Sequence, residues 1–169
     1  STDVHRPAAM LQLERLGSQL GIDVAAADPA EAPLAIATRA VTVVSPGRPE
    51  MKRALNGRVL VVFPRFSELA SRITIEAALV DERAWITSAC APLGFAPTIM
   101  LVGIEPSRDE IERAAEASAA ADATVLFLYD AHLYPTNRRL LDVVQARAQN
   151  LAAVLLRDPY DASFLSPDT

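Results

Sequence analysis

The sequence predicts an α/β fold in which helices cover both faces of a mostly parallel, doubly wound sheet, as a three-layer sandwich. Two observations predict it. Helical signals alternate with apolar runs of strand length, and such alternation produces parallel βαβ units. The apolar runs also lack polar alternation, which is typical of strands buried on both faces; they are Arg58–Phe63, Thr98–Val102, Thr124–Tyr129 and Ala152–Leu156. The 169 residues suffice for one sizeable core.

Residues 1–40 are expected to form an N-terminal helical arm or linker, followed by the α/β-sandwich domain at 41–169. Leucines recur mostly at three- and four-residue steps between Met10 and Leu20, and Gly21 follows as a stop signal. A proline-punctuated linker and a short helix over Leu34–Ala40 come next. The β-branched run Val41–Val44 predicts a further strand.

Three helices are expected between the apolar runs. The first covers Asp81–Leu93, carries Trp85, Ile86 and Cys90, and stops at Gly94. The third begins at Pro135, which is tolerated in a first turn, and turns Leu140, Leu141 and Val144 inward.

The second helix begins with a capping box, because Ser107 and Glu110 stand at the spacing that lets each bond the other's amide. Its inner face is predicted to consist of small or apolar side chains, namely Ile111, Ala114, Ala115 and Ala119. Two ion pairs are expected on the solvent-exposed face of this helix, Arg108 with Glu112 and Asp109 with Arg113.

Composition narrows the function classes. A net charge of −5 argues against a nucleic-acid binder, which would carry a basic face. No apolar stretch is long enough for a membrane span. Ser1–Arg6 lacks the order of a signal peptide, but a mature chain would lack one too, so cytoplasmic and exported locations both stay open.

No cofactor or metal site is expected. Cys90 is the single cysteine, so an internal disulfide and a cysteine-based zinc site are excluded, and the thiol is expected to pack as a small buried hydrophobe. His5 and His132 are the only histidines, too few for a multi-histidine site. The glycine motifs of nucleotide cradles and the G-x-S-x-G elbow are absent.

A phosphoacceptor receiver domain is a weak interpretation. Asp130 could end a central strand as the acceptor, but the last strand runs into Arg157-Asp158-Pro159 rather than into Lys-Pro.

Two polar loops follow the last two central strands, and the carboxyl ends of parallel strands are where open α/β sheets bind ligands. The first loop offers Asp130, His132, Tyr134, Asn137 and Arg138, and the second offers Asp158 and Tyr160. These side chains would contact a ligand or a neighbouring domain. The alternative, which is favoured for the first loop, is that they satisfy backbone groups at a helix start and in a turn.

These loops also carry a family resemblance. The segments ADATVLFLYDAHLYPTNRRLLDVV and LAAVLLRDPYD resemble the C-terminal α/β-sandwich domain of glycoside hydrolase family 3, in its bacterial β-N-acetylhexosaminidase branch. That branch has an NAH-like turn, where this chain has Asp130-Ala131-His132, and an R-[ND]-P-Y-D segment, matched by Arg157–Asp161. Asp130 departs from the asparagine of that turn. Upstream, Met10–Ile22 and Ala35–Ser45 resemble the helix leaving the family's barrel and the step that opens its second domain.

The resemblance implies a hydrolase of bacterial carbohydrate metabolism whose catalytic residues lie on an N-terminal barrel. A barrel needs about 250 residues, and this chain holds neither that length nor the family's K-H-F-P-G-H-G segment. No catalytic residue is therefore expected here. The chain would be a non-catalytic C-terminal domain, as a fragment or a separate protein. It would pack on the barrel and border a site for β-linked N-acetylglucosamine.

Two rival functions remain. The strand-end loops could bind a sugar in a stand-alone module, through Asp130, His132, Asn137 and Arg138. An independent hydrolase using an Asp130–His132 pair ranks last, because residues two apart in a turn rarely face one another and no nucleophile is evident.

Overall fold

The computed structural model describes residues 41–43, 49–70, 81–157 and 159–166. The chain divides into two compact units, Ser1–Val44 and Ser45–Thr169, and the elements below belong to the second. The predicted amphipathic segment Met10–Leu20 and the helix over Leu34–Ala40 lie outside the described residues. The expected strand at Val41–Val44 is wrong where it can be checked, since residues 41–43 have no regular structure. A β-branched run favours a strand only where a neighbouring strand pairs with it.

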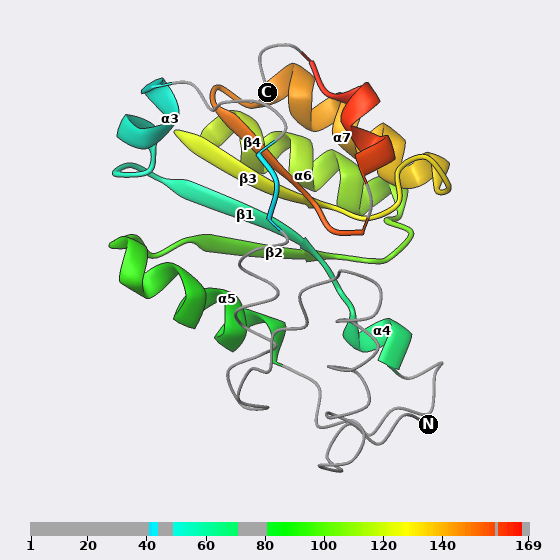
Figure 1. Cartoon of the computed structure of the whole chain (residues 1–169), viewed down its shortest axis with the longest axis horizontal. Coiled ribbons are helices and arrows are strands. Elements are labelled where there is room, and N and C mark those ends of the chain that lie inside the picture. Colours follow the sequence, from blue (N-terminus) through cyan, green and yellow to red (C-terminus); the bar gives the residue numbers. More distant parts are fainter. Residues whose placement is uncertain (1–40, 44–48, 71–80, 158, 167–169) are drawn as a thin grey trace, which may run out of the picture. The chain divides into compact units, whose positions relative to one another are not determined.

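The sheet contains four parallel strands in the order β2-β1-β3-β4, which confirms the predicted doubly wound class (Figure 1). Each apolar run forms a strand within one residue of its expected bounds: β1 (Val59–Pro64), β2 (Thr98–Val102), β3 (Ala123–Leu128) and β4 (Leu151–Leu155). In the register, Leu60 lies opposite both Thr98 and Thr124, and Val125 lies opposite Ala152.

The order of the strands explains why helices lie on both faces. The chain leaves β1 for β2, and then crosses back over β1 to reach β3 and β4. Because such crossovers are right-handed, reversing their direction moves the connecting helices to the opposite face. Thus α5 (Glu82–Cys90) covers one face, and α6 (Arg108–Ala120) and α7 (Pro135–Arg147) cover the other (Figure 1). The reversal also places a switch point between β1 and β3.

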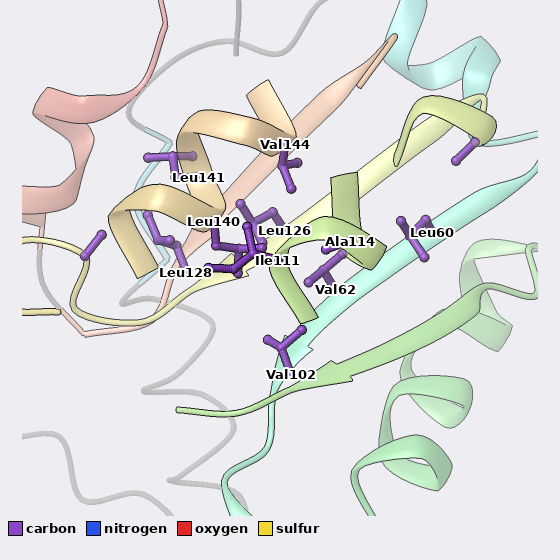
Figure 2. Close-up of a cluster of buried hydrophobic side chains, with 12 residues drawn as sticks. Leu60, Val62, Val102, Ile111, Ala114, Leu126, Leu128, Leu140, Leu141 and Val144 are labelled. Carbon is purple, nitrogen blue, oxygen red and sulfur yellow. The ribbon is translucent and has the colours of Figure 1, made fainter. Parts of the chain in front are cut away.

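The larger core cluster lies between the sheet and the α6–α7 layer. Figure 2 shows Leu60, Val62 and Leu126 of the sheet meeting side chains from both helices. The helices contribute the predicted inward residues Ile111, Ala114, Leu140, Leu141 and Val144, all buried. Truncating a leucine in such a cluster costs about 2–5 kcal/mol, because a cavity remains after the lost transfer energy.

A smaller cluster lies on the opposite face, where Val61 and Phe63 meet Ile86 and Cys90 of α5. The alternation of Leu60 and Val62 with Val61 and Phe63 shows that β1 is buried on both faces. This accounts for a strand sequence without polar alternation.

The helix boundaries follow from local chemistry. The Asp81 carboxylate accepts from the Arg83 and Ala84 amides at the start of α5. The short 3-10 helix η1 (Ala91–Leu93) ends this segment, and Gly94 follows with φ +82°, where a side chain would be strained.

The capping box at Ser107 and Glu110 is present, as predicted. The predicted inner face of α6 needs one correction. Ala119 is exposed and Ser118 is buried in its place, because four residues after Ala114 the helix returns to the sheet at position 118.

Three short elements were not expected from the sequence: α3 (Pro49–Ala54), α4 (Ser67–Ala70) and the 3-10 helix η2 (Pro159–Phe164). Of these, η2 brings the end of the chain back toward the first polar loop.

At the amino edge of the sheet, Asp122 joins three strands. Its carboxylate accepts from the backbone amide of Arg58 at 2.7 Å and from that residue's guanidinium at 3.2 Å. Its carbonyl accepts from Asn150 Nδ2 at 2.9 Å. Gly57 is required beside it, since a Cβ there would lie 2.6 Å from Asp122 Oδ2.

Candidate functional site

The two polar loops lie together at the carboxyl edge of the sheet, as predicted. They are joined by an ion pair between Asp130 and Arg157 and by hydrogen bonds from the first loop to Asp161. We call residues 129–134, Arg157 and η2 the rim.

Asp130 is the strained residue of the rim. Its φ is +44°, the one positive value seen at a non-glycine residue in the described part of the chain. Its carbonyl accepts from the amides of Leu133 and Tyr134 at 2.9 Å, which closes the turn. Its carboxylate, in a residue only 2% exposed, lies 2.7 Å from Arg157 Nη1. Left-handed backbone is tolerated by aspartate better than by most side chains.

Asp161 fixes the other half of the rim. Its carboxylate accepts from the amides of Ala131 at 2.8 Å and His132 at 2.9 Å. Oδ1 also lies 2.9 Å from His132 Nδ1, and the two side chains are 4% and 24% exposed. The carboxylate therefore sets both the backbone and the ring orientation at His132.

Aromatic rings continue from the rim along the switch point. Tyr129 contacts Phe66, which follows β1, edge to face at 5.4 Å, and stacks on Tyr134 at 6.1 Å. Arg157 lies over the Tyr129 ring at 5.8 Å. The hydrogen bond to the Tyr129 hydroxyl and the charge of Asp130 raise the pKa of Arg157, so the guanidinium stays charged.

The remaining predicted site residues have different surroundings. Asn137 is buried and donates to the carbonyls of Ile104 and Tyr129, which ties the ends of β2 and β3. Arg138 pairs with Asp142 at 3.1 Å and lies over Phe164 at 3.8 Å. Tyr134 is the first residue before α7, and Asp158 lies outside the described residues.

Tyr160, by contrast, is 70% exposed and meets the His132 ring edge to face at 5.6 Å. Among the predicted site residues that the structure describes, its side chain is the one most accessible to a ligand.

A second charged cluster lies beyond β1. Arg65 bridges Glu68 and Glu110, the latter at 2.9 Å. Glu110 also accepts from the amides of Gly103 and Ser107. Burial works to raise the pKa of Glu110, but the hydrogen bonds from Ser107, Arg65 and Gly103 prevail and lower it. Here the ionised carboxylate organises the helix start.

The arrangement of the rim bears on which chemistry it can perform. Asp130 faces Arg157, and His132 faces Asp161, so the Asp130–His132 pair considered for a hydrolase is not formed. Retaining glycoside cleavage needs two carboxyl groups about 5–5.5 Å apart around the scissile bond. Both rim carboxylates are instead turned into the protein and hydrogen-bonded.

Sequence reasoning passed over Arg157 and Asp161 as site residues, although both stand in the quoted R-D-P-Y-D segment. The available signal was Asp161, an acidic residue two positions after Pro159. Its carboxylate can accept hydrogen bonds from backbone amides of the first polar loop. Arg65 and Glu110 were also missed, because the sequence gives no hint that they meet across 45 positions.

Within the described ranges, no group of three or more His, Cys, Asp or Glu side chains could hold a metal ion. No helix in that part of the chain has the length and apolar character to cross a bilayer.

Comparison with known proteins yields one structural similarity. No protein-family model and no curated protein sequence matches the chain. The chain is similar to a glycoside hydrolase family 3 β-N-acetylglucosaminidase from Paenibacillus sp. str. FPU-7, with a TM-score of 0.60 and 21% identity. The match covers 93% of this chain and 31% of that enzyme. The chain thus has a fold found in part of a glycoside hydrolase family 3 enzyme and spans under a third of its length.

Proposed function

We propose that the chain serves as a non-catalytic domain of the kind that follows the barrel in glycoside hydrolase family 3, and that it packs against such a barrel. The observation that carries the proposal is the structural match, which takes in 93% of this chain but 31% of the enzyme. The part of that enzyme that this chain does not match would correspond to the barrel that serves as its partner.

The construction of the rim supports a contact role. Asp161, Asp130 and Arg157 brace one another and the backbone, and so hold the loop after β3 in one conformation. A braced loop loses little conformational entropy when another domain packs on it. Both carboxylates are used in the bracing, which leaves the supply of acid and nucleophile to the partner.

The substrate class in this proposal is β-linked N-acetylglucosamine, since the similar structure is named a β-N-acetylglucosaminidase. The rim would border the cleft, and its exposed polar side chains include Tyr160 and Arg157, at 70% and 58% respectively.

Two measurements test the proposal. The isolated chain is expected to release no aryl group from an aryl β-N-acetylglucosaminide, and turnover that His132→Ala abolishes would overturn the non-catalytic role. Determining the gene sequence around the segment that encodes Ser1 is expected to reveal a barrel with a K-H-F-P-G-H-G segment, in the same frame or in a neighbouring one. A genomic context without such a barrel would contradict the partner.

A stand-alone sugar-binding module is the second candidate. It is favoured by the exposed ring of Tyr160 beside a histidine that Asp161 holds in place. An aromatic face with polar groups at its edge suits a neutral pyranose. Calorimetric titration with N-acetylglucosamine oligomers separates the two candidates. Micromolar affinity of the isolated chain, lost in Tyr160→Ala, would favour the module.

A further inference from the structure

The outer edge of β2 has backbone groups that no other strand of the described sheet pairs with. β2 is the end strand of the sheet, and its Val102 carbonyl accepts from the Arg65 amide on the β1 side at 2.7 Å. Because backbone groups alternate along a strand, those of Ile99 and Leu101 point away from β1. In the part of the chain that the structure describes, no strand pairs with this side, and no acceptor is seen for these two amides.

A cavity of about 200 Å³ lies along this edge. Ile99, Met100 and Leu101 form its floor. One wall comes from α5 through Arg83, and the other comes from α6 through Arg113 and Ala117. The edge strand therefore lies at the bottom of a groove between the two helical layers, where an extended segment could reach it.

The walls of the groove are basic. Arg83 Nη1 donates to the Ile99 carbonyl at 2.8 Å, and Arg65 Nη2 donates to the Leu101 carbonyl at 3.4 Å. An added strand would have to displace these guanidinium groups, so that its own N–H groups bond the two carbonyls and Arg83 is released to pair with an acidic side chain of the added strand. Within the described residues, Arg113 donates to the Asp109 carbonyl at 3.4 Å and to no other acceptor. Of the charged residues that line the cavity, Arg83 and Arg113 are basic and Glu110 is acidic, so the lining carries a net positive charge.

We propose that this groove binds an extended acidic peptide segment of a partner protein, which adds to the sheet as a strand beside β2. The amides of Ile99 and Leu101 would donate to the peptide backbone, and Arg83 and Arg113 would pair with acidic side chains that alternate along it. Added strands of this kind take affinity from the main chain and specificity from alternate side chains. The surface is separate from the rim, so this inference does not depend on the proposed glycosidase context.

A second copy of the chain fits the groove less well. The β2 sequence, TIMLV, carries no acidic residue to meet the arginines. Pairing of two β2 edges would also bring two copies of Arg83 into one groove, and like charges in such proximity oppose association. Charge complementarity therefore selects an acidic segment of another protein.

The test uses a six-residue peptide that alternates valine and glutamate and carries a fluorescent label at its N-terminus. The full chain is titrated into this peptide, and binding is followed by the fluorescence anisotropy of the label. We expect saturable binding that slows hydrogen exchange at the Ile99 and Leu101 amides. N-methylation of alternate peptide amides, or lysine in place of glutamate, should weaken binding about tenfold or more, since each removes one of the two recognition terms.

Arg113→Gln should weaken binding of the same peptide several-fold, while its matched control Arg139→Gln, an exposed arginine on α7, should leave it unchanged. The inference is overturned if the peptide fails to bind at about millimolar concentration. It is equally overturned if the methylated peptide binds as well, if both arginine variants behave alike, or if the chain sediments as a dimer whose contact protects the β2 amides.

Discussion

The Asp161 carboxylate lies 2.9 Å from Nδ1 of His132 and also accepts hydrogen bonds from the backbone amides of Ala131 and His132. A residue of the last 3-10 helix thus holds the loop that follows β3, across 29 positions of sequence. The conformation of the loop is therefore supported by a carboxylate that lies outside the loop itself.

Asp161→Ala is expected to destabilise the fold by about 2–3 kcal/mol, because two loop amides lose their acceptor in a site with little access to water. Urea unfolding measures the change. The control is Asp142→Ala, which removes an exposed helix-surface ion pair with Arg138 and should cost no more than about 0.5 kcal/mol. Equal losses in the two variants would show that Asp161 does not hold the loop.

Substitutions at Asp130 should separate its two roles. Asp130→Asn keeps a side chain that tolerates the φ of +44° but gives up the charge that faces Arg157. Asp130→Ala gives up both, so it should be the more destabilising variant, at about 1–3 kcal/mol. Thermal unfolding ranks them, and an alanine variant as stable as the asparagine variant would refute the strain argument.

Gly57→Ala should lower the urea midpoint more than Gly94→Ala. The added methyl at position 57 would meet Asp122 at 2.6 Å and push it away from Arg58. At Gly94 nothing lies within 4 Å, so only the strain of φ +82° opposes alanine, at about 1 kcal/mol. The reverse order would mean that the contact between Arg58 and Asp122 is easily rearranged.

Stability should fall in acid partly through Glu110. Its folded-state pKa is below the ordinary value of 4.5, so its contribution is present above that value and is lost as pH falls through the folded-state pKa. Urea midpoints measured between about pH 6 and pH 3 should show the loss. Glu110→Gln should flatten this part of the profile, whereas Glu112→Gln, at an exposed pair with Arg108, should leave its shape unchanged.

The Cys90 thiol should react slowly with a disulfide reagent in the native chain. Burial against Val61, Phe63 and Ile86 raises its pKa, and the thiolate is the reactive form. We expect the reaction rate to rise sharply on adding denaturant, as followed by absorbance of the released thiol. Native-state reaction as fast as that of the unfolded chain would show that the α5 layer opens readily.

The sheet and its helical layers could be predicted because each central strand is apolar on both faces and each helix has a local start signal. Ser107 with Glu110, Asp81 and Pro135 are such signals, and each acts within a few residues. Val41–Val43 lacked that support, since strand formation depends on pairing that a local run does not specify.

The position of the rim could be predicted, because parallel strands bring their carboxyl ends to one edge. Its internal pairing could not. The sequence spacing equally allows Asp130 to bond its own turn. It does not reveal that Asp130 faces Arg157 or that Asp161 faces His132. Whether the candidates Asp130, His132, Tyr134, Asn137, Arg138, Asp158 and Tyr160 contact a sugar or a domain stays a prediction.

The contacts of Asp122 have a consequence for how the strands align. The sequence of β4, LAAVL, is apolar on both sides. Sliding the strand by one residue would therefore exchange one set of apolar side chains for another, and hydrophobic burial would oppose the slip only weakly. Asp122 bonds the residue before β1 through its carboxylate and the residue before β4 through its carbonyl. One aspartate thereby fixes the positions of three strands relative to one another, and it specifies a register that their apolar sequences alone do not specify.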